Sequence, residues 1–497
     1  MGGRKTIILL ILIILTITAV SCAEAENTQD GGGQQENNNQ ENSGDTISGQ
    51  ADETDMFFTP ELPDMHFEGY TFNILNTEND SVTWLLTQLE SEEETGEAFN
   101  DAVYRRNRIA EEKYGINISE TLVVDYGQVN SNARRIIRAG GEDYDLYMLQ
   151  AGDALSMAQD GSIVDYRDIP NVDLSKGYWD RDMVRDLSLG ERLFVFSGDF
   201  NFTPYSATIV MFFNKKLHSD LQLPDVYQSV RDGKWTFDAF HNMAKTASAD
   251  LDGNGVFNQY DQYGYMSLNF LLYPSFIISG GENFLKKNAD DMPVLSVDGE
   301  RFTSVYHKIL SIMHDGNLLY DADLAGRDHR HQDVMFPGNQ ALFWSELMNW
   351  AKILRDMEAD FGILPHPKFN DTQEGYHSVV FGPSFMLVPS TSGDLARTGV
   401  ILEALCAESR KTVMPAYYDI QLQTITTRDE ESGEMLNIIF SNRTYELGQL
   451  FFSGQVFDPF NTMARANNGD VGSYIDRNAD RIETAIERVV ERLAEVD

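Results

Sequence analysis

The feature that most constrains the fold is an alternation of strand-like and helix-like segments along about 440 residues. Residues 70–76, 116–124 and 144–150 are short segments that read as strands, the last of them as a buried strand. Residues 97–114 between them place Phe99, Val103, Ala110 and Tyr114 near one helical face, and Gly115 follows as a stop signal. Such alternation predicts α/β layers with substantially parallel sheets. A chain of this length exceeds what one core supports, so we expect two lobes.

The same patterns continue to the C-terminus without an internal repeat. The further predicted strands are residues 193–196, 208–213, 341–344, 361–364 and 384–388, and the further predicted helices are residues 131–139, 236–249, 304–314, 347–357, 395–407 and 473–496. Ligands of such sheets bind in a crevice at the carboxyl ends of the strands, and two lobes place that crevice between them. This arrangement serves a binding protein and an enzyme equally well.

The N-terminus has the pattern of an export signal. Arg4 and Lys5 precede an uncharged, mostly apolar run of 14 residues, 7–20, which is shorter than the roughly 20 residues that span a bilayer. The run ends in Ala-Val-Ser-Cys, residues 19–22, which resembles a bacterial lipobox, although Ala19 stands where leucine is more usual. The resemblance implies that residues 1–21 are cleaved and that Cys22 is lipidated. The alternative is an ordinary secretory signal with an incidental cysteine.

The residues after Cys22 have the composition of a tether. Residues 22–56 are almost entirely polar and glycine-rich, and such a segment has too little apolar surface to fold. The chain has only two cysteines, so with Cys22 lipidated there is no disulfide framework. We expect Cys406, in an apolar run, to be a small buried residue.

The net charge restricts the partners. A formal charge of −40 argues against nucleic acid and against anionic lipid surfaces. It favours a neutral or cationic ligand and a soluble protein, which we expect to be a monomer.

Seven stretches, in this order, resemble the extracellular solute-binding proteins of ABC importers, in the class that includes maltose-binding protein. The stretches are residues 67–72 (FEGYTF), 100–107 (NDAVYRRN), 144–147 (YDLY), 213–217 (FNKKL), 233–237 (GKWTF), 360–365 (DFGILP) and 415–419 (PAYYD). The resemblance implies a two-lobed, type II periplasmic-binding-protein fold that closes on its ligand like a clamp and is read by the membrane subunits of the importer. It also implies a location outside the cytoplasm, on the outer face of the membrane to which the lipid on Cys22 anchors it.

The resemblance gives lobe boundaries as well. Lobe 1 is predicted from residues 66–205 and 370–412, and lobe 2 from residues 206–369 and 413–497. The chain is expected to cross between them near residues 202–207, 365–369 and 411–416.

Candidate ligand-binding residues are aromatic and polar side chains near predicted strand ends. A sugar presents apolar C–H faces to aromatic rings and hydroxyls to carboxylates and amides, and its site mixes both kinds of group. The candidates are Trp344, Glu346, Asp153, Tyr205, Trp84, Tyr417 and Tyr418. The alternative for each is burial in the core or simple exposure, and we assign Trp235 and Trp350 to packing. A sugar or oligosaccharide is the favoured ligand, with a peptide or a polyol as alternatives.

A twelve-residue segment has the pattern of a calcium-binding loop. An EF-hand-type loop places oxygen ligands at alternate positions with glycine sixth. The oxygens would come from the side chains of Asp250, Asp252, Asn254, Asn258 and Asp261 and from the Val256 carbonyl, with Gly255 sixth. The twelfth residue is Asp instead of Glu, which shortens the reach, and the alternative is an Asx-rich turn without an ion. A bound calcium would have a structural role.

Other chemistry finds little support in the sequence. His329 and His331 lie among charged residues with no third metal ligand near, which indicates a solvated loop. The sequence contains no nucleophile elbow, phosphate loop, His-Glu-x-x-His or Cys-x-x-Cys motif. The remaining alternatives are an exported glycoside hydrolase, which needs two positioned carboxylates, and a lipoprotein that senses a ligand without serving an importer.

Overall fold

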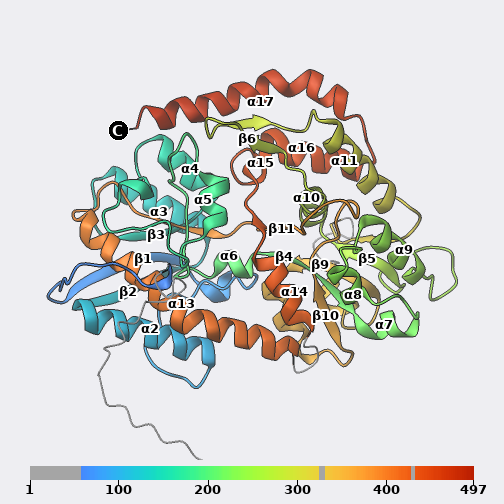
Figure 1. Ribbon diagram of the computed structural model, residues 1–497, viewed down its shortest axis with the longest axis horizontal. Helices are drawn as coiled ribbons and strands as arrows, with labels where there is room; N and C mark the ends of the chain where they lie inside the picture. Colours follow the sequence, from blue (N-terminus) through green and yellow to red (C-terminus); the bar gives the residue numbers. More distant parts are fainter. Residues whose placement is uncertain (1–56, 324–330, 427–430, 497) are drawn as a thin grey trace, which may run out of the picture. The chain divides into compact units, whose positions relative to one another are not determined.

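The structure is a computed structural model that describes residues 57–323, 331–426 and 431–496 (Figure 1). The predicted signal, the tether, Cys22 and His329 lie outside the described residues. Among the helices of the described part, none combines the length and the apolar character that crossing a bilayer requires.

Strands and helices alternate as the sequence predicts. The strands are β1 Tyr70–Thr77, β2 Ile116–Val123, β3 Leu146–Gln150, β4 Ile209–Asn214, β5 Tyr263–Ser267, β6 Leu285–Lys287, β7 Pro293–Leu295, β8 Leu319–Asp321, β9 Ala341–Leu347, β10 Phe361–Leu364, β11 Ser378–Val379, β12 Ser384–Leu387 and β13 Arg443–Thr444. The longer helices are α2 Ala98–Tyr114, α3 Tyr126–Arg138, α4 Ala151–Gln159, α9 Phe237–Ala247, α10 Asn269–Ser279, α11 Glu300–Met313, α13 Leu395–Thr426, α14 Glu431–Phe440, α16 Asp458–Arg465 and α17 Val471–Ala494. Short helices are α5 Arg181–Leu187, α6 Thr203–Ser206, α7 Lys215–Asp220, α8 Val226–Arg231, α12 Gln332–Met335 and α15 Leu447–Leu450.

Two sheets form the centres of two lobes. The first sheet has the order β12-β3-β1-β2, in which β1 is parallel to β2 and β3, and β12 is antiparallel to β3. The second sheet has the order β10-β4-β9-β5-β8, in which β5 is parallel to β8 and β9, and β4 is antiparallel to β9 and β10. The expected parallel core is therefore present in each sheet, with antiparallel strands beside it.

Helix α2 illustrates how local signals set an element. The Glu97 carboxylate accepts hydrogen bonds from the Phe99 and Asn100 amides and so caps the first turn. Gly115 ends the helix in the left-handed region, with φ 61°, which glycine adopts without a Cβ penalty. Both predicted ends of this helix are confirmed.

Two predicted elements differ from the structure in type. The helix predicted over residues 347–357 is present as a 3₁₀ helix over residues 348–356, after a strand over residues 341–347. The predicted strand at residues 193–196 makes one isolated bridge, from Phe196 to Met386. Both differences arise in segments whose periodicity does not separate the alternatives.

Paired crossing segments connect the lobes. Helix α6 leads from the first lobe into β4, at the predicted first crossing. The Phe381 amide donates to the Ala207 carbonyl at 3.0 Å, and Thr208 bridges to Val380, so the return segment runs beside the first. The backbone of Lys368 forms hydrogen bonds with the backbone of Trp235 and Phe237 in the second lobe. The chain therefore crosses back to the first lobe after residues 365–369, where the crossing was predicted. Helix α13, which contains Pro415, makes the third connection by packing on α2 and then on α14.

The lobes also touch away from the crossing segments. Asp291, beyond β6, accepts hydrogen bonds from the Ser188 hydroxyl and the Glu191 amide of the first lobe, each at 3.0 Å. The long C-terminal helix α17 extends past both lobes (Figure 1): Tyr474 packs on Phe460 of α16, and the Leu493 carbonyl accepts a hydrogen bond from Arg192 at 2.7 Å. Residues 413–497, predicted as lobe 2, therefore contact both lobes.

Candidate functional site

A cavity of about 670 Å³, here called the cleft cavity, lies at the strand ends of both sheets. Its described lining residues are Trp84, Gln150, Leu268, Phe270, Leu271, His331, Gln332, Asp333, Val334, Glu346, Leu347, Trp350, Phe381 and Gly382. Gln150 ends β3, Leu268 follows β5, and Glu346 and Leu347 end β9, while Gly382 precedes the antiparallel β12. The cavity is thus at the carboxyl ends of the parallel strands, where the alternating pattern predicts a ligand site.

Aromatic side chains supply much of the apolar wall. Trp84 follows β1 and leaves 42% of its surface exposed. Phe270 of α10 and Phe381 of the crossing segment have ring centroids 5.3 Å apart. Trp350, which was expected to pack in the core, also lines the cavity. The 3₁₀ helix after β9 places it there.

Polar groups interrupt this apolar wall. The Glu346 side chain is buried, and its Oε1 accepts a hydrogen bond from the Leu347 amide at 3.0 Å. Gln332 is buried as well, and its Nε2 has no hydrogen-bond partner among the described residues. None of the described lining residues is Lys or Arg. Carboxylate and amide groups among rings suit a neutral ligand that has both hydroxyls and apolar faces.

Two of the predicted binding residues, Trp84 and Glu346, share the cleft cavity, whereas Trp344 does not line it. Trp344 lies two residues before Glu346 in β9, and its ring is fully buried against Phe212 and Phe336, with centroids 5.5 and 5.4 Å away. A residue in the middle of a central strand faces the layer packed on the sheet, and only a residue at the strand end reaches the crevice. The expectation that the Trp344 ring faces the ligand is therefore corrected.

The other four predicted residues lie elsewhere. Asp153 is in the first turn of α4, where α3 engages it through Asn130 and through Arg134 at 3.3 Å, and it lines neither of the two large cavities described here. Tyr417 is buried between Phe99 and Phe202. Tyr205 and Tyr418 line a second cavity.

Four residues of the cavity wall are not among the predicted binding residues: Gln150, Phe270, Gln332 and Phe381. Gln150 is the last residue of a correctly predicted strand, so the strand-end argument could have found it. Gln332 and Phe381 lie in connections without periodicity, and only the tertiary structure brings them to the cavity.

The predicted calcium loop connects α9 to β5, and its carboxylates cluster. One carboxylate oxygen from each of Asp250, Asp252 and Asp261 lies within 4.8 Å of the others. Asp250 accepts hydrogen bonds from the Gly253 and Gly255 amides, and the Gly255 hydrogen bond is the main cause that lowers the pKa of Asp250. Three clustered carboxylates are a donor set that fits a hard cation.

The assignments of Trp235 and Cys406 to the core are confirmed. The Trp235 ring is fully buried and donates from Nε1 to the Pro365 carbonyl at 2.9 Å, and the Thr236 hydroxyl accepts from the Ala239 amide at the start of α9. Cys406 is a free, buried thiol.

Several solved structures share this fold at low sequence identity. UspC from M. tuberculosis has a TM-score of 0.55 at 14% identity, covering 82% of this chain and 98% of its own. An ABC substrate-binding protein from Listeria monocytogenes, solved with cycloalternan, has a TM-score of 0.54 at 13% identity, covering 84% of this chain and 99% of its own. A sugar transporter structure from Rhizobium etli in an open conformation has a TM-score of 0.54 at 12% identity, covering 86% and 100%. These likenesses show a two-lobed, type II periplasmic-binding-protein fold.

Comparison of the sequence with curated proteins gives no match. A family model gives a match that covers residues 90–395, which is more than half of the chain. That span includes β3, β5, β9 and β12, whose ends form the cleft cavity. The protein is therefore a member of the bacterial extracellular solute-binding protein family.

Proposed function

We propose that this protein binds a sugar or an oligosaccharide in the cleft cavity and delivers it, as a monomer, to an ABC importer without chemical change. The observation that carries the proposal is the composition of that cavity: Trp84, Trp350 and two phenylalanines lie beside the Glu346 carboxylate and two glutamines. Rings pack against the C–H faces of a sugar, and carboxylates and amides bond its hydroxyls. The sugar ligands and sugar transport named for structural neighbours support this class of ligand.

Both lobes contribute to the proposed site, which gives the mechanism. Gln150 belongs to the first sheet, and Glu346 belongs to the second. A ligand that contacts both lobes binds the closed form more tightly than the open form. It shifts the equilibrium toward the closed form by the difference between these two binding free energies. The importer would then recognise the closed protein, and no bond in the ligand is made or broken.

The test is isothermal titration of the purified protein with a panel of oligosaccharides, followed by variants of Trp84. We expect Trp84→Ala to weaken the binding of the best oligosaccharide by roughly two- to tenfold, since a stacking ring contributes about 0.5–1.5 kcal/mol. Trp84→Phe keeps a ring and should recover much of the affinity. Tyr260→Ala, which removes an aromatic side chain exposed elsewhere, is the matched control.

Three outcomes contradict the proposal. Binding of no oligosaccharide by the wild-type protein would exclude the ligand class, and release of shorter sugars from the oligosaccharide would indicate a glycoside hydrolase. Equal affinities of the wild-type protein and Trp84→Ala would move the site away from the cleft cavity.

We also propose that Cys22 carries a lipid that anchors the protein at the outer face of the membrane, after removal of residues 1–21. The basis is the short apolar run that ends in Ala-Val-Ser-Cys. Cys22→Ser should release the protein from membranes into the medium. Mass spectrometry of the N-terminal peptide should show acyl chains on Cys22 in the wild-type protein, and an unmodified peptide that begins elsewhere would contradict the anchor.

We propose, finally, that the loop 250–261 binds calcium, which would hold the connection between α9 and β5. The support is the cluster formed by the carboxylates of Asp250, Asp252 and Asp261. When bound, calcium would neutralise the repulsion among the three carboxylates.

A further inference from the structure

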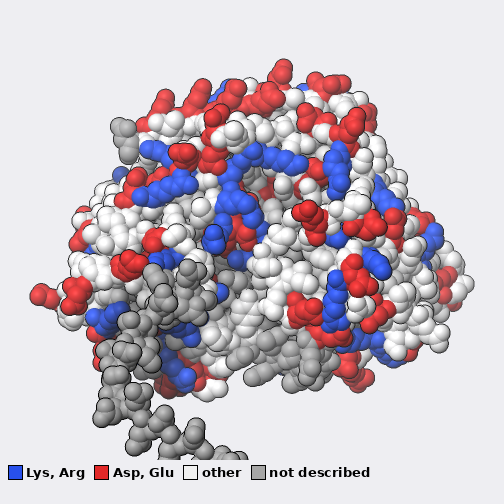
Figure 2. All heavy atoms as spheres, in the orientation of Figure 1, with Lys and Arg blue, Asp and Glu red and all other residues white. Residues whose placement is uncertain are grey.

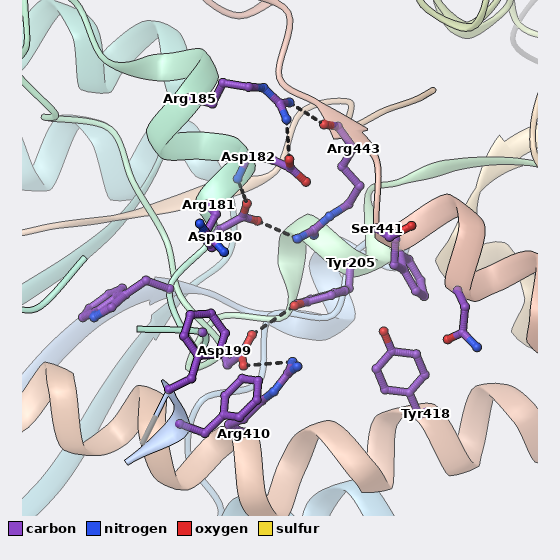
Figure 3. Close-up of a pocket in the computed structure, with 16 residues that line it drawn as sticks. Asp180, Arg181, Asp182, Arg185, Asp199, Tyr205, Arg410, Tyr418, Ser441 and Arg443 are labelled. Carbon is purple, nitrogen blue, oxygen red and sulfur yellow. Dashed lines mark hydrogen bonds and ion pairs between the residues drawn. The ribbon is translucent and has the colours of Figure 1, made fainter. Parts of the chain in front are cut away.

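A second cavity, of about 740 Å³, lies beside helix α6, which contributes Tyr205 to its lining. It shares no residue with the cleft cavity, and its lining includes Asp180, Arg181, Asp182, Arg185, Asp199, Tyr205, Arg410 and Arg443. We call it the arginine cavity (Figure 3). Nothing in the proposed sugar binding uses it.

Positive charge gathers around this cavity in an otherwise acidic protein. Four arginines and three aspartates line it, whereas the whole chain has a formal charge of −40. Figure 2 shows Lys and Arg side chains around the hollow in the middle of this face, while Asp and Glu predominate along α17. The local sign of charge is thus opposite to that of the molecule.

Arg443 is the most buried of the four arginines, with 5% of its side chain exposed. Its Nη2 donates to Asp180 Oδ2 at 2.7 Å, and its guanidinium lies 4.3 Å from the centre of the Tyr205 ring. Its Nε and Nη1 have no hydrogen-bond partner among the described residues. A buried guanidinium with two unsatisfied nitrogens is costly unless another acceptor approaches.

Arg410 and Arg181 add positive charge to the cavity, and the neighbouring aspartates neutralise only part of it. Arg410 extends from α13 toward Asp199 (Figure 3), and the two are 3.4 Å apart. Burial raises the pKa of Asp199 to about 7, so this carboxyl is only partly charged near neutral pH. Arg181 is exposed, and no ion pair joins it to an acidic side chain among the described residues; its guanidinium lies 5.7 Å from the centre of the Phe57 ring.

The aspartates of the cavity already have donors. Asp180 accepts from Arg443 and from the Tyr445 hydroxyl through Oδ2, and from two backbone amides through Oδ1. Asp182 pairs with Arg185 at 2.6 Å, and Asp199 accepts from the Tyr205 hydroxyl at 3.0 Å. The carboxylates therefore stay engaged, and the unsatisfied groups of the cavity are hydrogen-bond donors.

We propose that the arginine cavity binds a small organic anion through its carboxylate or phosphate oxygens, with Arg443, Arg410 and Arg181 as donors. A planar guanidinium matches the geometry of these oxyanions and forms charge-assisted bonds with them. The rings of Phe58, Tyr418 and Phe440 in the same lining offer contacts for the carbon skeleton of such an anion. The site would be independent of the sugar in the cleft cavity.

The experiment is isothermal titration of the full chain with two probes, citrate and inorganic phosphate, at constant ionic strength set by sodium chloride. We expect at least one probe to bind, and binding of only citrate or only phosphate would identify which oxyanion the site prefers. Arg410→Gln and Arg181→Gln should each weaken that binding about tenfold, because each removes one charge-assisted hydrogen bond. Both side chains are partly or fully exposed, so the variants keep the fold, which thermal melting verifies.

Arg138→Gln is the matched control. Arg138 is an exposed arginine of α3 that pairs with Asp160 and lines neither cavity, so its replacement should leave the affinity unchanged. The proposal is overturned if neither probe binds the wild-type protein. It is also overturned if Arg410→Gln and Arg181→Gln bind the probe as tightly as Arg138→Gln does.

Discussion

At the scale of single residues, position along a strand decides between packing and binding. Trp344 and Glu346 lie on the same strand, two residues apart, yet Trp344 is fully buried and Glu346 borders the cleft cavity. Trp84, in the connection after β1, has no layer over it and remains exposed at the cavity wall. Whether a large aromatic residue packs in the core or lines the cavity thus depends on whether it lies within a strand or beyond the end of one.

We therefore expect Trp344→Ala to act on stability. Removing a fully buried indole leaves a cavity and should lower the free energy of unfolding by about 3–5 kcal/mol. Chemical denaturation measures this change, with Trp84→Ala as the comparison, for which a decrease of less than about 1 kcal/mol is expected. A stability of Trp344→Ala equal to that of Trp84→Ala would contradict the assignment to the core.

A buried carboxyl should make stability depend on pH. Burial raises the pKa of Glu446 to about 7, although backbone amides, including those of Leu285 and Gln449, lower it in part. An unfolded glutamate has a pKa of about 4.3, so the folded state holds the proton more tightly. The free energy of unfolding should fall as pH rises from about 4.3 to about 7, by up to about 1.4 kcal/mol per pH unit for this group, and level off above.

Melting of the wild-type protein and Glu446→Gln across this pH range tests the expectation. Glu446→Gln has no proton to lose at this position, so the stability of the variant should depend less on pH than that of the wild-type protein. This expectation holds even if the substitution changes the absolute stability. Parallel pH profiles of the two proteins would show that Glu446 does not titrate in this range.

At the scale of elements, the ends of helices and strands carry the functional groups. The cleft cavity takes residues from the ends of β3, β5 and β9, and the loop between α9 and β5 groups three aspartates. Helix α13 is much longer than its apolar pattern predicts, because tertiary packing on α2 and α14 supports it beyond Pro415.

Calcium should stabilise the loop between α9 and β5. Millimolar calcium is expected to raise the melting temperature by about 1–3 °C, because an ion that binds only the folded state shifts the unfolding equilibrium. Asp250→Asn should lose this shift, while Asp298→Asn, an exposed aspartate outside the loop, should keep it. An equal shift in both variants, or none in the wild-type protein, would count against the site.

At the scale of the whole molecule, the two lobes contact each other outside the crossing segments as well. Asp291 of the second lobe holds the turn at Ser188–Glu191 of the first, and α17 contacts both lobes. These contacts must rearrange in any motion that opens the cleft.

Asp291→Ala should weaken the contact between the second lobe and the turn at Ser188–Glu191 of the first. The variant removes the acceptor of the Glu191 amide, so amide hydrogen exchange at residues 188–192 should become about five- to tenfold faster. Mass spectrometry of exchanged peptides measures the rate, and small-angle scattering of the unliganded variant should give a larger radius of gyration. Asp290→Ala, an exposed neighbour, is the control; equal exchange in both variants would show that Asp291 does not restrain the lobes.

The sequence by itself determined the layers of this protein. Strand and helix patterns depend on residues close in the chain, so the order of elements, the caps of α2 at Glu97 and Gly115, and the positions of Glu346 and Trp84 near strand ends could be predicted. Which face of a strand is covered, and which distant segments meet, depends on packing between residues far apart. For this reason only the tertiary structure placed Trp344 in the core, brought Trp350 and Phe381 to the cleft, and gathered Arg181, Arg410 and Arg443 around a second cavity.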